Sequence, residues 1–442
     1  MNLTSNKNIF NIAYPVCLTL IAQNIINVTD TAFLGHLSET ALGASAIAGM
    51  FYIAVYVVGF GFSQGAQILI GRRNGEKDYE KIGLIFNNGL FFNFLLSIII
   101  FTFSFFYISQ IIRFLVTSNE VYNAVIEYLD WRIYGFFFSF LNIMFRSLYV
   151  GITQTRVLTV SAVITSVTNV FFDYAMIFGN CGFPELGIAG AAIASVIAEV
   201  VTFLFLLGYT LLKMDTKRYV LFYFSKTDWK VIKQMLNLSI FIMFQFLIST
   251  STWFLFFIFI EHMGERPLAI TNIGRSLYML LMIPGIALST TISTLVSNLI
   301  GSGRKNEVLP FINRMIKITL IAVIPFTVFT FVFPELIVQI YTDDIDLIRA
   351  SAPVIRVVSA AMIFCAVGNM IFNSVSGTGN TRTAFLIEFV TMFFYITYIY
   401  YTAIVYPSTT AVVWLSEFVY WILIGGSGYY YLKKGNWQKK EI

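Results

Sequence analysis

Charged residues are rare in this chain. Asp, Glu, Lys and Arg make up 12% of its 442 residues, whereas soluble globular proteins contain about 25%. Hydrophobic residues account for 58%, and the mean hydropathy is +0.78. This balance excludes an ordinary soluble protein and predicts an all-α polytopic membrane protein.

Residues for metal, redox or nucleotide chemistry are scarce as well. The three cysteines, Cys17, Cys181 and Cys365, show no CxxC or zinc-ligand spacing, and the two histidines, His36 and His262, form no metal pair. No GxxxxGK[ST] loop, HExxH motif or Ser/His/Asp set occurs. We therefore expect no cofactor. If the chain is a transporter, an ion gradient has to drive the transport.

Neither a nucleic-acid partner nor a cleaved leader is expected. The net charge is +5, but its positive residues lie in short loops between hydrophobic stretches. The N-terminal segment MNLTSNKNIF lacks the basic, apolar and small-residue order of a signal peptide, so the first helix is expected to be retained.

Hydrophobic stretches long enough to cross a bilayer recur twelve times, with only short connections between them. They lie at about 9–34, 42–70, 83–110, 123–148, 157–179, 186–212, 235–262, 268–300, 311–333, 353–376, 383–405 and 410–432. The connections leave no room for a soluble catalytic domain.

Lys and Arg gather on one side of these spans. They occur after the second, fourth, sixth, eighth and tenth spans and in the C-terminal tail, whereas the alternate connections carry mainly acids. The positive-inside rule then places both termini in the cytoplasm of a bacterial inner membrane. The longest basic connection, 213–234, is expected to be an ordinary cytoplasmic linker, with a lipid-binding or regulatory patch as the alternative.

Two loop motifs occur once in each half of the chain. Gly75 and Gly303 end similar glycine-rich turns, and Gly151 and Gly377 begin another pair of similar turns. The separation along the chain is nearly the same for both pairs, and six spans per copy predict two lobes related by a pseudo-twofold axis along the membrane normal. The expected division is an N-lobe of residues 1–212, the linker 213–234 and a C-lobe of residues 235–442.

Polar residues share one face of the first span. Thr19, Gln23, Asn27 and Asp30 are spaced four, four and three residues apart, which places them on one side of a helix. A carboxylate inside a membrane helix is costly, so Asp30 is a candidate functional residue. The alternative is that Asp30 lies near enough to the helix end at Gly35 to reach water.

The fifth and sixth spans carry matching polar groups. Asn169 and Asp173 lie one turn apart, and Asp173 is six residues before Gly179. At about 1.5 Å per residue, Asp30 and Asp173 lie at a similar depth, roughly 8–9 Å in, and Ser195 enters from the same side to a comparable depth. Oxygen ligands of this kind, with no Lys or Arg expected nearby, suit a proton relay or a Na⁺ ion held by Asp30, Asn169 and Asp173. Two unrelated acids at helix ends are the alternative.

Other intramembrane polar residues are weaker candidates. Glu199 lies one turn beyond Ser195, and Glu388 and Glu417 lie in the second half of the chain. Arg275 and Arg356 fall inside spans and are expected to neutralise acids. The aromatic runs 91–94 and 136–138 are expected to pack or to face lipid instead of forming a drug-binding cage.

These residues resemble a known family. Pro15, Gln23, Asp30 and Gly35 are similar to the first-helix signature of the MATE (multidrug and toxic compound extrusion) transporters. Asn169, Asp173 and Gly179, followed by PELGIAGAA at 184–192, resemble that family's fifth and sixth helices. The resemblance covers essentially the whole chain.

The family resemblance implies a V-shaped pair of six-helix lobes and an N-lobe cation site formed by residues that match Asp30, Asn169 and Asp173, with Ser195 as the candidate hydroxyl. The chain departs from the NorM-like branch, whose seventh and tenth helices carry acids. Here the seventh span has Gln245, Ser249 and Thr252, and the tenth has Cys365 and Asn369, without a carboxylate. This favours a DinF-like member and puts a C-lobe cation site in doubt.

The sequence thus predicts a secondary antiporter, not an enzyme. It would export organic, drug-like compounds, cationic or aromatic, across the lipid bilayer in exchange for H⁺ or Na⁺, acting as a monomer. A flippase for lipid-linked oligosaccharides or lipids from the same superfamily is one alternative. A polytopic membrane enzyme is the other, and the two histidines argue against it.

Overall fold

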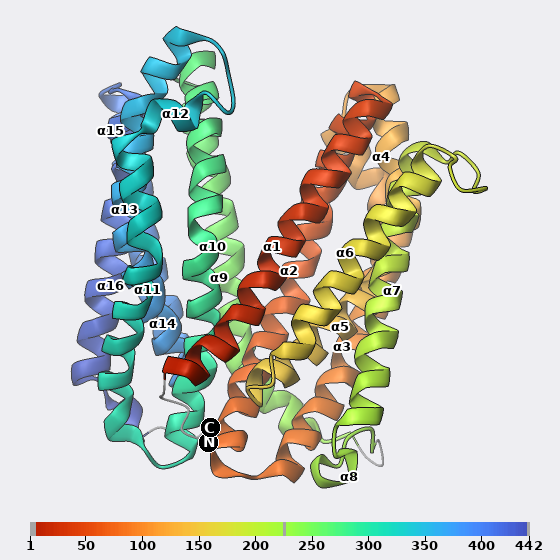
Figure 1. Cartoon of the computed structure of the whole chain (residues 1–442), viewed down its shortest axis with the longest axis vertical. Coiled ribbons are helices and arrows are strands. Elements are labelled where there is room, and N and C mark those ends of the chain that lie inside the picture. The colour runs from red at the N-terminus through yellow and green to blue at the C-terminus, as the bar shows by residue number, and fades with distance from the viewer. Residues whose placement is uncertain (1–5, 224–226, 440–442) are drawn as a thin grey trace. The chain divides into compact units, whose positions relative to one another are not determined.

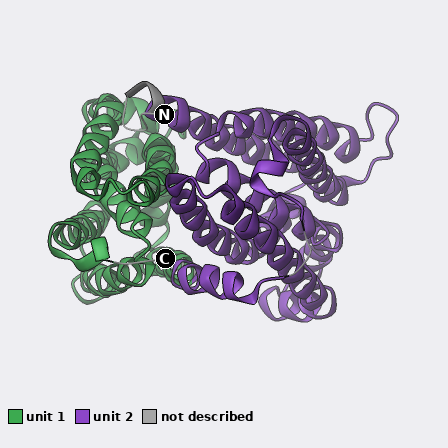
Figure 2. Ribbon diagram, turned by 90° about the horizontal axis from the view of Figure 1, so that it is seen from below, with its two compact units in different colours: residues 1–6, 244–442 green, residues 7–243 purple. Residues whose placement is uncertain are grey.

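The computed structural model describes residues 6–223 and 227–439, and every regular element within these ranges is a helix (Figure 1). The chain divides into two compact units (Figure 2): an N-terminal unit of residues 7–243 and a C-terminal unit built almost entirely from residue 244 onward. The boundary falls inside one long helix, α9 (Trp229–Glu261).

The N-terminal unit contains the helices that precede α9. They are α1 (Asn6–Leu37), α2 (Glu39–Glu76), α3 (Tyr79–Leu115), α4 (Asn119–Arg132), α5 (Gly135–Gly151), α6 (Arg156–Ile177), α7 (Gly187–Lys213) and the short α8 (Thr216–Tyr219).

The C-terminal unit follows with α10 to α16 and short irregular helices between and after them. Its elements are α10 (Glu265–Gly301), a 3₁₀ turn (Lys305–Glu307), α11 (Val308–Val332), α12 (Pro334–Val338), α13 (Ile345–Gly377), α14 (Thr381–Tyr400), a π-helical turn (Tyr401–Val405), α15 (Thr410–Trp414), α16 (Ser416–Lys434) and a last 3₁₀ turn (Asn436–Lys439).

The predicted membrane spans are confirmed, with one difference. In the described residues, eleven helices are long and apolar enough to cross a membrane, and the bent pair α4–α5 supplies a twelfth span. The sequence predicted one continuous helix at 123–148, but α4 and α5 meet at an angle of 54° around Ile133 and Tyr134. A partly buried ion pair, described below, lies at this bend.

Side chains before the helices determine where several of them begin. Ser38, Asp78, Ser118 and Asp344 each accept a hydrogen bond from a backbone N–H in the first turn of the helix that follows. These bonds satisfy N–H groups that have no partner inside the helix. At these four starts, the cap allows a new helix to begin after a short connection.

The basic connection between α7 and α9 is held against α3 by two buried asparagines. Asn87 donates to the Val220 carbonyl over 2.9 Å and accepts from the Phe222 N–H over 2.8 Å. Asn88 accepts from the Asp228 N–H over 2.8 Å. Because its backbone groups are paired in this way, the described part of the connection follows a defined path along the end of α3.

The repeated glycines occupy matching places in the two units. Gly151 lies against α2 beside the Gln67 carbonyl, and Gly377 lies against α10 beside the Ser293 carbonyl. Gln67 and Ser293 are separated along the chain by the same offset as the two glycines. The loop repeat therefore marks an equivalent close approach of helices in both halves.

Gly377→Ala is expected to destabilise the protein. An added Cβ would overlap the backbone of Ser293, and such overpacking costs about 1–3 kcal/mol. The matched control is Gly426→Ala on α16, where nothing lies within 4 Å of the added Cβ and alanine favours the helix. Thermal unfolding of the purified variants in detergent should show a lower midpoint for Gly377→Ala alone; equal midpoints would contradict the close approach.

Candidate functional site

Two carboxyl groups meet inside the N-terminal unit. Asp30 of α1 and Asp173 of α6 lie close enough to share a proton in a hydrogen bond. Asp173 is completely buried, and Asp30 is half-buried. Two carboxylates in contact away from water repel each other, so the pair is stable only when a proton or a cation neutralises at least one charge.

Asn169 and Ser195 complete the group. Asn169, one turn before Asp173 on α6, is buried, and its Nδ2 lies 3.5 Å from Ser195 Oγ on α7. The predicted residues Asp30, Asn169, Asp173 and Ser195 are thus gathered from three helices. The 3.6-residue period and the matched depth from the helix ends place them together.

The oxygens of this cluster lack donors. Asp30 Oδ1, both carboxyl oxygens of Asp173 and Asn169 Oδ1 are buried and accept no hydrogen bond from any described residue outside the pair. Buried acceptors without a donor are unfavourable unless a ligand satisfies them. A group of oxygens from carboxylate, amide and hydroxyl suits a proton between the two carboxyls or a hard cation such as Na⁺.

Two other residues of the predicted polar face do not join the cluster. Gln23 and Asn27 are exposed on α1, and in the described part of the chain their side chains make no hydrogen bond with the carboxyl pair. Thr19 donates to the Pro15 carbonyl and lies 3.4 Å from the Leu158 carbonyl of α6. The four polar residues of α1 therefore have different surroundings. Thr19 contacts α6, and of the four only Asp30 belongs to the cluster.

Glu199 is held in an ion pair. Arg132, the last residue of α4, donates to both of its oxygens over 2.8 and 3.1 Å, and Tyr52 of α2 donates to Oε1 over 2.8 Å. The Arg132 guanidinium also lies 3.6 Å from the centre of the Tyr52 ring. This bidentate pair neutralises Glu199, which differs in this respect from the carboxyl pair.

The ion pair corrects one expectation from the sequence. Arg132 is close enough to act electrostatically on Asp30, although no cation was expected near the carboxyl pair. The only sequence signal was an arginine inside the fourth predicted span. The pair lies at the bend between α4 and α5, where Gly135 leaves room for it, because a side chain at Gly135 would collide with Arg132 and Glu199.

The acids of the C-terminal unit have different surroundings. Glu417 on α16 accepts hydrogen bonds from Tyr278, Tyr395 and Trp421 over 2.8 to 3.1 Å. Glu388 on α14 accepts from Ser249 of α9 and from Tyr420 of α16, the latter over 3.2 Å. The polar face of α9, which lacks an acid of its own, therefore meets a carboxylate from another helix.

Arg275 and Arg356 do not neutralise these acids. Within the described ranges, neither arginine forms an ion pair, and the Arg275 guanidinium lies 5.1 Å from the centre of the Phe257 ring. Gln245, one turn before Ser249 on α9, has a buried side-chain oxygen without a donor.

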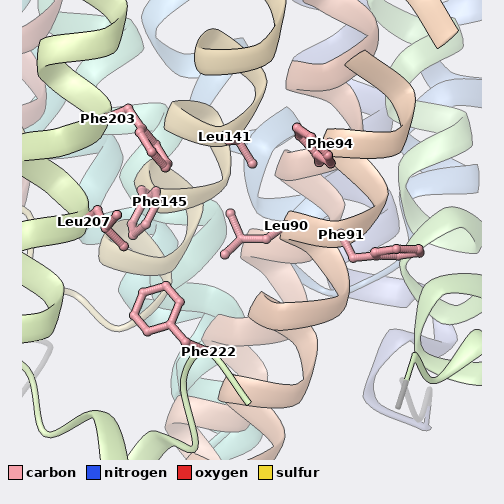
Figure 3. Close-up of a pocket in the computed structure, with 8 residues that line it drawn as sticks. All are labelled: Leu90, Phe91, Phe94, Leu141, Phe145, Phe203, Leu207 and Phe222. Atoms are coloured by element: carbon pink, nitrogen blue, oxygen red, sulfur yellow. The ribbon is translucent and has the colours of Figure 1, made fainter. Parts of the chain in front are cut away.

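An apolar pocket of about 280 Å³ lies on the N-terminal unit (Figure 3). Its lining comes from α3, α5, α7 and the connection after α8, and consists of Leu90, Phe91, Phe94, Leu141, Phe145, Phe203, Leu207 and Phe222. None of these side chains carries a charge or a hydrogen-bonding group, so only the faces of its phenylalanine rings could attract a cationic compound. The expected packing or lipid-facing role of Phe91 and Phe94 agrees with this lining.

Curated relatives match most of the chain. A probable multidrug resistance protein NorM of Thermotoga maritima is 26% identical over 390 residues, which cover 87% of this chain and 83% of that protein. A probable multidrug resistance protein NorM of Synechococcus is 22% identical over 400 residues, covering 86% and 83%.

Solved structures share the fold. A MOP superfamily transporter from Pyrococcus furiosus superposes with a TM-score of 0.90 at 18% identity, covering 98% of this chain and 97% of that one. A multidrug resistance MATE family transporter in an outward-facing conformation superposes with a TM-score of 0.89, also at 18% identity, covering 99% and 98%.

A family model also matches both halves. The model described as MatE covers residues 15–175 and 242–401, which include the carboxyl pair in the first segment and Glu388 in the second. The match spans more than half of the chain and occurs once in each of the two units. The chain therefore belongs to the MatE family of membrane transporters, as its resemblance to MATE proteins predicted.

Proposed function

We propose that this protein is a secondary antiporter that exports drug-like organic compounds, cationic or aromatic, in exchange for H⁺ or Na⁺. The observation that carries the proposal is the buried pair of Asp30 and Asp173, whose oxygens lack donors. Membership of a transporter family excludes the membrane-enzyme alternative.

Helices α1 and α6, which carry Asp30 and Asp173, are joined by hydrogen bonds from hydroxyl groups of α6 and of Thr155, the residue just before α6. Thr155, Thr159 and Ser166 donate to the carbonyls of Ile12, Pro15 and Ala22 on α1 over 2.9 to 3.3 Å. These bonds hold the first half of α1 to α6 without charge. The second half of α1 carries Asp30, so its contact with α6 depends on the ion held there.

Ion binding and release would then act on α1. A bound proton or Na⁺ neutralises the pair and allows Asp30 and Asp173 to stay in contact. When the ion leaves, the carboxylates repel each other, and the second half of α1 is less stable in its present position. The ion thus binds more tightly when Asp30 and Asp173 are in contact than when they are apart. Such a difference in affinity between two conformations is what couples ion binding to transport.

The proposal extends to location and branch. The basic connections support a bacterial inner-membrane location with both termini in the cytoplasm. The protein would act as a monomer of two lobes, 1–212 and 235–442, joined by 213–234. The absence of acids at Gln245, Ser249, Cys365 and Asn369 favours a DinF-like member.

Transport in proteoliposomes tests the function. The purified protein is reconstituted with a fluorescent cationic dye, and a pH jump is compared with a Na⁺ jump of equal size. We expect one of the two gradients to drive dye movement against its own concentration gradient, and that gradient identifies the coupling ion. Vesicles with equal ion concentrations on both sides are the control. Dye movement that responds to neither jump would contradict the proposal.

A further inference from the structure

Glu388 is a buried acid that the proposed mechanism does not use. Its side chain belongs to α14 and is 2% exposed. Ser249 of α9 and Tyr420 of α16 both donate to Oε1. The second oxygen, Oε2, is equally buried and accepts no hydrogen bond from any described residue.

No positive charge acts on Glu388 from the described residues packed around it. The groups that act on it are the Ser249 and Tyr420 hydroxyls, and the other charged group that acts on Tyr420 is also an acid, Glu417. Tyr395, from the same helix as Glu388, also faces Tyr420. In the described part of the chain, Glu388 takes part in no ion pair.

Glu417 shows a more complete set of hydrogen-bond donors in the same unit. Three donors from Tyr278, Tyr395 and Trp421 satisfy both of its oxygens. Donors on both oxygens stabilise the carboxylate form of a buried acid more than donors on one oxygen alone. Glu388 has two donors on one oxygen and none on the other, which is the pattern of a neutral acid: Oε1 accepts as a carbonyl oxygen, and Oε2 carries the proton.

Gln245 supplies an acceptor next to this site. It lies one turn before Ser249 on the same face of α9, and its buried Oε1 has no donor. The rings of Phe244 and Phe385 pack with centroids 6.4 Å apart, which places this turn of α9 beside the turn of α14 that precedes Glu388. A proton on Glu388 therefore faces a helix that presents a free amide oxygen.

We propose that Glu388, with Gln245, Ser249 and Tyr420, forms a second proton-binding site, located in the C-terminal unit and separate from the Asp30–Asp173 pair. The site can stabilise Glu388 both with and without its proton. The protonated acid avoids a buried charge, and the two hydroxyls stabilise the carboxylate after the proton has left. The proton would be bound and released during transport, and this part of the inference rests on the proposed function.

Infrared difference spectroscopy tests the site without any transport. The spectra are recorded at low and high pH on Asp30→Asn/Asp173→Asn protein, in which the N-terminal pair is silent. We expect a carbonyl band of a protonated carboxylic acid that shifts in D₂O and disappears at high pH. The band should be lost in the additional variant Glu388→Gln and kept in the additional variant Glu417→Gln, which is the matched control.

A second variant covers the case in which Glu388→Gln does not fold. Tyr420→Phe removes one donor to Oε1 and keeps the acid, so the band should remain but disappear at a different pH. A band that survives Glu388→Gln, or no titrating band at all, would overturn the proposal. A change at Glu388 that follows Na⁺ at constant pH would overturn the assignment to a proton.

Transport then tests the role in coupling. In proteoliposomes with otherwise wild-type protein, Glu388→Gln should lower dye accumulation driven by the pH jump at least tenfold while dye binding at equilibrium is retained. Unchanged pH-driven accumulation would overturn the coupling role. If the wild-type protein itself moves no dye, the proposed function fails, whereas the infrared result still decides whether Glu388 binds a proton.

Discussion

Asp173→Asn is expected to abolish ion-coupled export and to leave the protein folded. Asparagine has the shape of the protonated acid but cannot release a proton, and it supplies one oxygen where a Na⁺ ion would meet two. The fold should tolerate the change, because neither carboxyl oxygen of Asp173 accepts a hydrogen bond from the described residues outside the pair. The substitution also removes the repulsion between two buried acids. Asp30→Asn should have the same effect.

Dye efflux from proteoliposomes measures this result, and size-exclusion chromatography with thermal unfolding reports on the fold. The expected rate for either variant is that of protein-free vesicles. Asp130→Asn is the matched control, because Asp130 is an exposed acid on α4, outside the cluster, and its loss should leave the rate unchanged. Full drug resistance in cells that express Asp173→Asn would refute the mechanism.

The carboxyl pair was predictable from the sequence for a geometric reason. Asp30 and Asp173 lie five and six residues before glycines at the ends of their helices, so counting at a fixed rise per residue gives a matched depth. Asn169 follows from the helical period. Each of these spacings is measured within a single helix. Because both helices cross the same membrane, equal spacings from their ends predict equal depths.

Arg132 was not predictable in the same way. Hydropathy shows one span at 123–148, whereas the chain bends by 54° between α4 and α5 and brings Arg132 to Glu199, 67 residues away. Ser249 and Glu388 are 139 residues apart and meet only because α9 and α14 pack together. Such partners depend on which helices are neighbours, and the periodicity of one helix does not contain that information.

The two halves share a bridge that the sequence did not reveal. Tyr52 donates to Glu199, and Tyr278 donates to Glu417, both over 2.8 Å. The two tyrosines are separated along the chain by the same offset as the loop glycines Gly151 and Gly377. The glutamates do not share this offset, so a comparison of sequences alone misses the pair. The N-terminal unit adds an arginine to its bridge, and the C-terminal unit adds a tryptophan and a second tyrosine instead.

Breaking the bridge in the N-terminal unit is expected to be strongly destabilising. Glu199→Leu leaves the Arg132 guanidinium beside the Tyr52 ring without its carboxylate partner. Loss of one partner of a fully buried ion pair costs about 3–5 kcal/mol, so the loss from this partly buried pair should lie at or below the lower end of that range. Arg132→Met leaves Glu199 with Tyr52 as its remaining side-chain donor and should cost a similar amount. The double variant removes both charges and replaces them with apolar side chains, so it should be more stable than either single variant.

Thermal unfolding of the three variants in detergent measures the coupling between the two positions as a double-mutant cycle. Glu307→Gln is the matched control, because Glu307 forms an exposed ion pair with Arg304, and its loss should barely change the midpoint. If the effects of Glu199→Leu and Arg132→Met simply add in the double variant, the two side chains do not act as a pair. A strong coupling, in contrast, would mean that Glu199 holds the Arg132 guanidinium in place near Asp30. The charge that changes during transport would then be that of the Asp30–Asp173 pair and its bound ion, while the charge of Arg132 stays constant.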